Sequence, residues 1–341
     1  MTPLALVLLT LSGMLGAEPK YQPLPADHGG LGATIPASVV FEPNRTYSRP
    51  TPGIELKLDL ARPKDKTGPF PAVVCVHGGA WISGNRKALP IILELASRGY
   101  VGITIDYRLA TTAPFPACVR DVKTAVRWLR ENAKAYNIDP DRIAVVGYSA
   151  GGHLAALLAT TEGLTCFEAP IEGLAALVGG PGAQPPPRFP VPGTEYFTQS
   201  SSIKSAVGYY APTDLAALYE FAMTDPKVSR AERVVAQAAF IQLLGGTPRM
   251  QPAAAAYASP VTYVTRHSKP LLLLHGTSDH LVPGDQSHRL ADRYALLKAD
   301  CELVWFHRAG HSIGSGIGGR AGELADACAF RFLDYHLHPG P

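Results

Sequence analysis

The sequence lacks two features that would point to a charged or membrane-bound partner. Its 31 basic and 28 acidic residues leave a formal net charge of only +3, and they form no block of like charge. Electrostatic attraction therefore gives no reason to expect binding to nucleic acid or to an anionic membrane. No apolar stretch reaches the roughly 18 residues that a membrane-spanning helix needs. We therefore expect a mature protein without a stable membrane span.

Cysteine is scarce as well, and its positions exclude two kinds of scaffold. The chain has five Cys residues, with neither a CxxC pair nor a Cys/His spacing typical of a zinc site. Their odd number leaves at least one thiol unpaired in a monomer. A disulfide between Cys301 and Cys328 stays open for an exported protein, because sequence alone does not pair cysteines. The histidines form no metal-binding pair at helical spacing, so we expect no metal.

The first 17 residues are predicted to be an export signal. Leu4–Leu15 is an apolar run too short to span a bilayer but long enough for the core of a signal peptide, and Gly16-Ala17 offers a cleavage site. The alternative is a buried N-terminal helix. Export would place the protein in the periplasm or outside the cell. Residues 18–45 form a Pro/Gly-rich extension that is predicted to wrap the surface.

Short buried strands alternate with helices along the rest of the chain. Continuous apolar runs, typical of strands covered on both faces, occur at 72–76, 101–105, 143–146, 206–210, 271–274 and 301–306. Helical signals occur at 88–98, 122–133, 150–160, 285–299 and 321–337. This alternation predicts an α/β fold with a mostly parallel central sheet and helices on both faces. Ligand sites in such sheets lie at the carboxyl ends of the strands.

Residues 46–341 are assigned to this α/β domain. Within it, Ile54–Leu60 alternates apolar and polar residues, as a half-buried edge strand does. Residues 179–265 contain an insert and a cover. The insert, 179–193, is a Pro-rich segment that cannot hold a regular helix. Residues 213–265 are predicted to be mainly helical and to lie over the carboxyl-terminal edge of the sheet.

The segment GYSAG at 147–151 matches G-x-S-x-G between a predicted strand and a predicted helix. This motif places its serine on a sharp turn, where the residues two before and two after must be small. Gly147 and Gly151 meet that need. Ser149 is therefore the predicted nucleophile, close to a helix N-terminus that favours negative charge. The alternative is a chance match in a Gly-rich chain.

The segment HGGAW at 77–81 follows another buried strand and is interpreted as an oxyanion-binding loop. Acyl transfer develops negative charge on an oxygen, and backbone N–H groups must already face the place where it appears. We assign these donors to Gly79, Ala80 and Ala150, the last being the residue after the nucleophile. The alternative is a plain strand-to-helix turn.

Three side chains beside these motifs are given supporting roles. His77 is expected to hold the loop through hydrogen bonds of its imidazole. Trp81 and Tyr148 are predicted to line or support the substrate pocket.

The predicted acid and base follow the nucleophile in the order expected for this type of fold. Asp279, after the strand at 271–274, is predicted to accept a hydrogen bond from the catalytic imidazole. Two other carboxylates compete: Asp214 is expected to be a helix N-cap, and Asp285 to begin a helix. His311, beyond the last strand, is the predicted base, and its rival His307 is interpreted as structural.

With these motifs, the chain resembles α/β-hydrolases of the esterase/lipase superfamily, and it is most similar to bacterial feruloyl- and acetyl-esterase-like members. The matching segments cover roughly residues 54–335 and include HGGAWISGNR (77–86), GYSAGGHLAA (147–156), HGTSDHLVP (275–283) and RAGHS (308–312). The resemblance implies hydrolysis of carboxylic esters by a Ser149–Asp279–His311 triad without a cofactor. One residue departs from the family pattern: Ala80 stands where the usual oxyanion loop has a third Gly.

The resemblance and the predicted export favour a short-chain acyl ester as substrate, either a small molecule or an acetyl or feruloyl ester of a plant polysaccharide. An amide hydrolase of the same fold, either an aryl formamidase or an exopeptidase, is the alternative. A more remote one is an inactive hydrolase acting as a binding module. GSGIGG at 314–319 fits a dinucleotide motif, but no strand follows the next helix, so nucleotide binding is not expected. The oligomeric state stays open.

Overall fold

The computed structural model describes residues 21–23, 34–65, 67–162, 167, 195–196, 198–314 and 319–338. The predicted export signal at 1–17 and the Pro-rich insert at 179–193 lie outside these residues. So do residues 315–318 of the dinucleotide-like run.

The strands and helices alternate along the chain as predicted. The strands are β1 (Tyr21–Pro23), β2 (Thr34–Pro36), β3 (Val39–Thr51), β4 (Ile54–Pro63), β5 (Phe70–Val76), β6 (Val101–Ile105), β7 (Ile138–Tyr148), β8 (Ser205–Tyr209), β9 (Leu271–Gly276) and β10 (Cys301–Phe306). The helices are α2 (Ile91–Arg98), α3 (Ala117–Glu131), α4 (Ala133–Tyr136), α5 (Ala150–Thr160), α7 (Leu215–Thr224), α8 (Arg230–Leu244), α9 (Pro252–Tyr257), α10 (Asp285–Leu296) and α11 (Gly319–Leu337). Two 3-10 turns, η1 (Arg86–Ala88) and η2 (Pro260–Thr262), complete the described elements.

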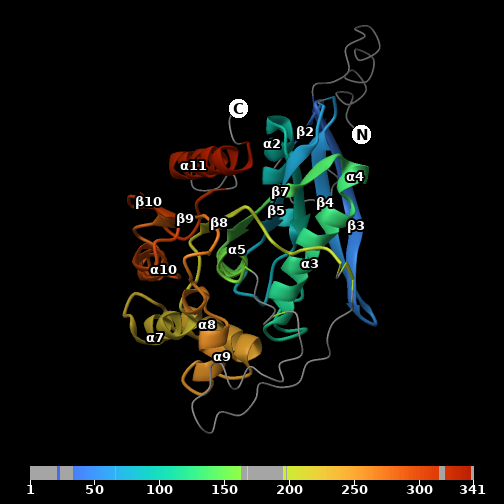
Figure 1. Cartoon of the computed structure of the whole chain (residues 1–341). Coiled ribbons are helices and arrows are strands. Elements are labelled where there is room, and N and C mark those ends of the chain that lie inside the picture. The colour runs from blue at the N-terminus through green and yellow to red at the C-terminus, as the bar shows by residue number, and fades with distance from the viewer. Residues whose placement is uncertain are drawn as a thin grey trace, which may run out of the picture.

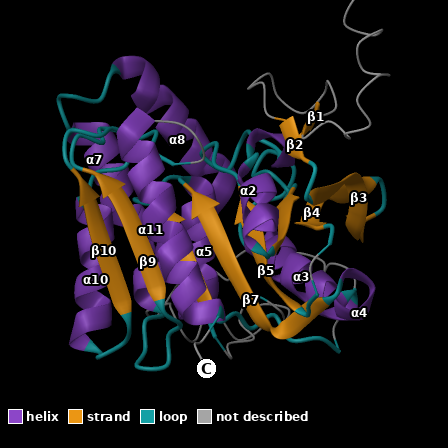
Figure 2. Cartoon of the chain, turned by 90° about the horizontal axis from the view of Figure 1, so that it is seen from above, coloured by secondary structure: helices purple, strands orange, loops and turns teal. Residues whose placement is uncertain are grey.

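The main sheet has the strand order β10-β9-β8-β7-β5-β6-β4-β3 within the described residues. The pairs from β6 to β10 are all parallel, whereas β4 pairs antiparallel with both β3 and β6. Figure 2 shows β7, β9 and β10 running in the same direction. The prediction of a mostly parallel sheet in an α/β fold is therefore confirmed.

The sheet is buried on both faces because its central strands are mostly apolar. Every residue of β5, β6, β8 and β9 is buried, and successive residues of each strand face opposite sides. On β5, Val74 and Val76 pack with residues of α3 and α5, whereas Val73 and Cys75 pack with residues of α2 and α11. The helices accordingly cover both faces (Figure 1).

The edge of the sheet differs from its prediction. β4 was expected to be the edge strand, but it lies between β3 and β6. The edge is β3, which begins at Val39, so the sheet takes in residues 39–45 that were assigned to the N-terminal extension. β3 has no clean alternation, because register shifts interrupt its pairing with β4 at three places. Such bulges hide a strand from a search for period two.

Smaller differences concern the ends of helices. The first α-helical residue of α2 is Ile91, and the segment before it forms the turn η1, so the start predicted at 88 is three residues early. α10 ends at Leu296, three residues short of the predicted 299. Cys301 and Cys328 are separate thiols and do not form the disulfide left open above. No helix of the described residues has the length and apolar character to cross a bilayer.

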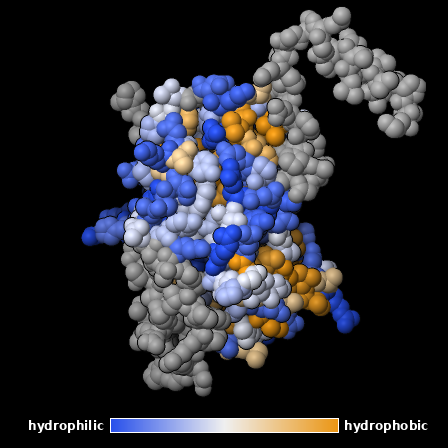
Figure 3. Space-filling model, turned by 90° about the vertical axis from the view of Figure 1, so that its right-hand side faces the viewer, coloured by the Kyte–Doolittle hydropathy of each residue, from blue (hydrophilic) through white to orange (hydrophobic). Residues whose placement is uncertain are grey.

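The cover is helical, as predicted for 213–265, and consists of α7, α8, α9 and η2. It lies beside the loops that follow the strands. The Phe240 ring on α8 lies 6.0 Å from that of Trp81, in the loop after β5. His280, in the loop after β9, lies 3.2 Å from the carboxylate of Glu232 on α8. The opposite flank, where β3 and α3 lie, is mostly hydrophilic with hydrophobic residues gathered in separate places (Figure 3).

Candidate active site

Ser149 lies on the turn between β7 and α5 in a backbone conformation that is rare for a residue with a side chain. Its φ is 53° and its ψ is −117°. A Cβ atom on Gly147 would lie 2.0 Å from the carbonyl oxygen of Gly151, and one on Gly151 would lie 2.1 Å from that of Val76. The need for small residues on both sides of the nucleophile is therefore confirmed. Strain of this kind persists only where the surrounding structure imposes it.

The predicted triad comes together in the structure. His311 Nε2 lies 3.0 Å from Ser149 Oγ, and His311 Nδ1 lies 2.8 Å from Asp279 Oδ2. Because an ionised carboxylate only accepts hydrogen bonds, Nδ1 donates to Asp279, and Nε2 is left to accept the serine proton. The loops after β7, β9 and β10 supply the three residues at one end of the sheet.

Asp279 is held as a carboxylate. Its side chain is fully buried, and its Oδ1 accepts the backbone N–H groups of Leu281 and Val282 at 3.0 Å each. Burial by itself raises the pKa of Asp279, but hydrogen bonds from His275 and His311 and the charge of His311 outweigh it, so the pKa lies well below its usual value. The acid is therefore ionised at neutral pH and holds the imidazole in the tautomer that can act as a base.

Asp214 and Asp285 have the helix-terminal positions predicted for them, whereas His307 is exposed. Asp214 caps α7, where its Oδ1 accepts the N–H of Ala217 at 3.0 Å. Asp285 is the first residue of α10 and pairs with Arg289 one turn later. His307 is exposed in the turn after β10 and makes no contact with the triad.

The predicted oxyanion loop lies against the nucleophile. A Cβ atom on Gly78 would lie 3.1 Å from Ser149 Cβ. Gly79, Ala80 and Trp81 follow with φ values of 110°, 51° and 63°, so three consecutive residues are left-handed. Within the described chain, the N–H groups of Gly79, Ala80 and Ala150 donate to no other protein atom. These three groups are therefore available to an oxyanion.

Ala80 keeps the donor of the glycine that it replaces, at a cost in backbone strain. A left-handed residue with a Cβ atom costs about 1–2 kcal/mol relative to the right-handed form. The loop is closed by Ile82 and Ser83, whose N–H groups donate to the carbonyl oxygen of Gly79 at 3.1 and 3.0 Å. These two bonds close the turn at Gly79.

His77 holds the loop as predicted. Its Nδ1 lies 2.7 Å from the carbonyl oxygen of Gly78, and its ring stacks on Tyr107 at 4.3 Å between centroids. The Tyr107 hydroxyl donates to the carbonyl oxygen of His77 at 3.1 Å. Burial lowers the pKa of His77, so the ring is neutral at neutral pH. His77 is a structural element of the site and not a second base.

The two side chains predicted to line or support the substrate pocket are both buried. Trp81 is 3% exposed and donates from its indole N–H to His153 Nδ1 at 3.1 Å. Tyr148 is 4% exposed and stacks on Tyr209 at 4.5 Å. Strand residues alternate between the faces of a sheet, and Tyr148 points into the core that α2 and α11 cover. Neither buried ring lines a pocket. Trp81 has the supporting role that its prediction included, whereas the pocket role predicted for Tyr148 is corrected.

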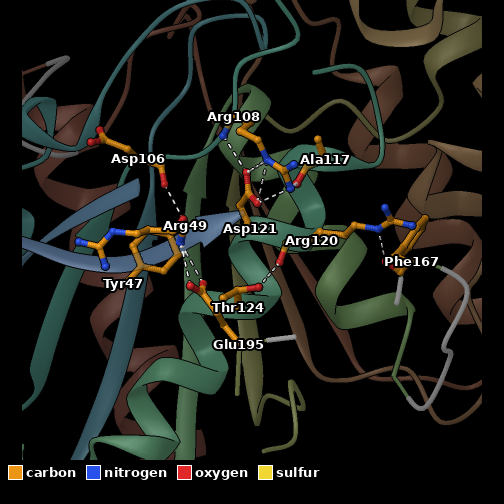
Figure 4. A network of polar contacts seen from close by, with 10 residues as sticks. All are labelled: Tyr47, Arg49, Asp106, Arg108, Ala117, Arg120, Asp121, Thr124, Phe167 and Glu195. Atoms are coloured by element: carbon orange, nitrogen blue, oxygen red, sulfur yellow. Dashed lines mark hydrogen bonds and ion pairs between the residues drawn. The ribbon is translucent and has the colours of Figure 1, made fainter. Parts of the chain in front are cut away.

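The loop after β6 is hydrogen-bonded to the oxyanion loop. Ala110 N donates to the carbonyl oxygen of Trp81 at 2.7 Å. A polar network holds this loop after β6 in place (Figure 4). Its Arg108 pairs with buried Asp121 of α3, and Tyr47 of β3 donates to the carbonyl oxygen of its Asp106 at 2.6 Å. The oxyanion loop is thus tied to strands and helices far from it in sequence.

Two histidines without a role predicted from the sequence support the site. His275, four residues before Asp279, directs Nε2 to Val282 O at 2.9 Å and to Asp279 Oδ2 at 3.4 Å, and its Nδ1 lies 2.7 Å from Ser287 Oγ. His153, one helical turn after Ser149, is fully buried beside Trp81. Each lies four residues from a catalytic residue, and this spacing is the sequence signal that could have indicated a supporting role. Within the described residues, no group of three His, Cys, Asp or Glu side chains could hold a metal ion.

Comparison with known proteins agrees with this geometry. The BD-FAE family model matches residues 58–294. The chain is 31% identical to Esterase LipC of Mycobacterium tuberculosis over 82% of this chain and 62% of that protein. It is 32% identical to the probable carboxylic ester hydrolase LipM of the same organism over 67% of this chain and 46% of that protein. The chain thus spans less than two thirds of the length of these curated relatives.

Two solved structures are similar over most of their length. A truncated carbohydrate esterase from gut microbiota has a TM-score of 0.68 and 25% identity, covering 88% of this chain and 96% of that one. The butyrate-bound esterase Est2 of Thermogutta terrifontis has a TM-score of 0.63 and 26% identity, covering 87% and 96%. Both are esterases, which agrees with a site built from a serine, a histidine and a buried carboxylate.

Proposed function

Because the chain belongs to the BD-FAE family of α/β-hydrolase esterases, we propose that it hydrolyses short-chain carboxylic esters through a covalent acyl-enzyme. The observation that carries this proposal is the hydrogen-bonded chain from Ser149 Oγ through His311 to Asp279. This hydrogen-bonded chain begins at a nucleophile that lies beside the N–H groups of Gly79, Ala80 and Ala150. An inactive binding module would need none of these features together.

The mechanism follows from the geometry of the triad. His311 Nε2 accepts the Ser149 proton as Oγ attacks the ester carbonyl carbon, and the carbonyl oxygen becomes an oxyanion held by the N–H groups of Gly79, Ala80 and Ala150. The tetrahedral intermediate collapses, and His311 gives the proton to the leaving alcohol. Water then attacks the acyl-enzyme in the same way, releasing the acid and restoring Ser149. No step needs a cofactor.

The proposed substrates are acetyl or feruloyl esters carried by plant polysaccharides. Two similar structures support a carbohydrate-linked ester: the gut carbohydrate esterase and a bifunctional GH43-CE protein of Bacteroides eggerthii, which is 26% identical with a TM-score of 0.65. The butyrate bound to the similar Est2 esterase supports a short acyl chain. Export through residues 1–17 remains part of this proposal, because extracellular polymers are reached only outside the cell. Amide hydrolysis has no support among these relatives.

The test is hydrolysis of p-nitrophenyl esters from acetyl to palmitoyl by the wild type and by Ser149→Ala. We expect C2–C4 esters to be cleaved fastest and the variant to lose about six orders of magnitude in kcat. Acetylated and feruloylated xylan oligosaccharides would then rank the natural esters. Equal cleavage by Ser149→Ala would overturn the nucleophile. A preference for palmitoyl esters, or for aminoacyl anilides, would overturn the substrate class but leave the triad intact.

A further inference from the structure

The oxyanion loop carries more backbone strain than its own hydrogen bonds explain. Gly79, Ala80 and Trp81 are all left-handed, and two of them have a Cβ atom. Trp81 is the last of the three, and its bulky side chain makes this conformation unfavourable by itself. Something must therefore hold the Trp81 side chain in place, or the loop would relax and turn the Gly79 and Ala80 N–H groups away.

His153 meets this requirement. The Trp81 indole N–H donates to its Nδ1 at 3.1 Å, and its Nε2 lies 2.6 Å from the carbonyl oxygen of Ala258. The two rings meet edge to face with centroids 5.3 Å apart. His153 belongs to α5, the helix that begins after the nucleophile, and Ala258 is the C-cap of α9 in the cover. One imidazole thus joins the nucleophile helix, the oxyanion loop and the cover.

The chemistry of the contact defines a single protonation state. An indole N–H only donates and a carbonyl oxygen only accepts, so Nδ1 must be bare and Nε2 must carry the proton. Full burial agrees with this neutral form, since it lowers the pKa of His153 to about 4. Both ring nitrogens of His153 are engaged, by Trp81 and by Ala258, so the imidazole takes no part in proton transfer. Its backbone N–H donates to the carbonyl oxygen of Ser149 at 2.9 Å, one turn earlier in the chain.

We propose that His153 is a positioning residue of the oxyanion hole, which anchors Trp81 and thereby keeps the Gly79 and Ala80 N–H groups directed at the oxyanion. The inference rests on the proposed ester hydrolysis and deepens it. The oxyanion is present in the transition state and absent from the bound ester. Loss of the anchor therefore lowers kcat and leaves KM nearly unchanged.

The two hydrogen bonds of His153 can be separated by substitution. In His153→Asn the amide oxygen takes the place of Nδ1 and still accepts from Trp81, but the contact with Ala258 is lost. In His153→Gln the amide nitrogen takes the place of Nε2 and still donates to Ala258, but the acceptor for Trp81 is lost. Trp81→Phe removes the indole donor and keeps an aromatic ring. Tyr294→Phe, which removes a buried hydroxyl that donates to Lys269 O at 3.2 Å, is the control remote from the loop.

The measurements are kcat and KM for p-nitrophenyl acetate, and the rate at which a fluorophosphonate labels Ser149. We expect His153→Gln and Trp81→Phe each to lose about 10- to 100-fold in kcat and in labelling rate, with KM within twofold. The double variant, which combines His153→Gln and Trp81→Phe, should lose no more activity than the single variant with the larger loss, because both substitutions remove the same hydrogen bond. His153→Asn and Tyr294→Phe should stay within threefold of wild type even where their Tm falls.

The outcomes separate this inference from the proposed function. Equal losses in His153→Asn and His153→Gln, or additive losses in the double variant, would overturn the anchor. A folded Trp81→Phe variant that is labelled as fast as the wild type would also overturn the anchoring role of His153. Labelling does not depend on the natural substrate, so a wild type that is labelled rapidly but cleaves no short ester would overturn the substrate class alone. The ranking of the labelling rates among the variants would still decide the role of His153.

Discussion

The two sides of the active site are held by different means. On the nucleophile side, Ser149 and the oxyanion loop take up strained backbone conformations that close packing imposes, and Gly147 and Gly151 have no room for a side chain. On the acid–base side, Asp279 and His311 lie on loops and are placed by side-chain hydrogen bonds.

This difference predicts different kinds of failure. A substitution on the nucleophile side that adds an atom must disturb the backbone of β5 or α5, so it should lower the stability of the whole domain. A substitution on the acid–base side removes a hydrogen bond from a loop, so it should lower the rate and leave the fold in place. Four variants test the contrast.

Asp279→Asn should have the largest effect on the rate. The amide still accepts from Leu281 N and Val282 N, but it no longer stabilises the protonated imidazole or holds the proton on His311 Nδ1. We expect kcat to fall about 10⁴-fold, as for comparable changes in other triads. Steady-state kinetics measures the loss, and a thermal melt checks the fold. Loss of cooperative folding in the variant would contradict the contrast.

Gly151→Ala should have the largest effect on stability. Its Cβ would lie 2.1 Å from Val76 O and 2.6 Å from His77 O, and neither backbone atom can move without disturbing β5 and the oxyanion loop. We expect a loss of about 3 kcal/mol in the free energy of unfolding, measured in guanidinium chloride. Gly310→Ala is the matched control, because a Cβ there meets nothing within 4 Å. Equal stability of the two variants would refute the packing argument.

The ionisation of Asp279 should appear in the pH dependence of stability. Its pKa in the folded protein lies below the value of about 3.9 expected in the unfolded chain. The unfolded chain therefore binds the proton first, and the stabilisation is complete above about pH 4 and is lost as the pH falls through the folded pKa. The difference in unfolding free energy between wild type and Asp279→Asn should shrink as the pH falls below about 4. A difference that stays the same between about pH 4 and about pH 2 would contradict the assignment.

His280→Gln should have the smallest effect, although this residue follows the catalytic acid directly. Its pair with Glu232 lies at the surface, where the His280 side chain is 49% and the Glu232 side chain 31% exposed, and such pairs contribute little to stability. We expect kcat and Tm close to those of wild type. A large loss of kcat would mean that the cover acts on the acid loop through this pair.

The sequence by itself determined the order of strands and helices, the nucleophile turn and the identity of the triad. These features depend on local rules: apolar runs for buried strands, small residues at fixed spacing around Ser149, and one chemistry-bearing residue after each strand. The capping role of Asp214 followed from the same kind of local rule. The edge strand β3 could not be predicted in this way, because its bulges interrupt the alternation of apolar and polar residues.

Only the tertiary structure decided which side chains support the site. Trp81 and Tyr148 look from the sequence like pocket residues, since both adjoin catalytic motifs, yet each turns into a core. His153 and His275 look like ordinary helix and strand residues, yet each contacts the machinery. The bond from Trp81 to His153 joins residues 72 positions apart, and that from His153 to Ala258 spans 105. No local pattern encodes such contacts, because they form when the sheet, α5 and the cover pack together.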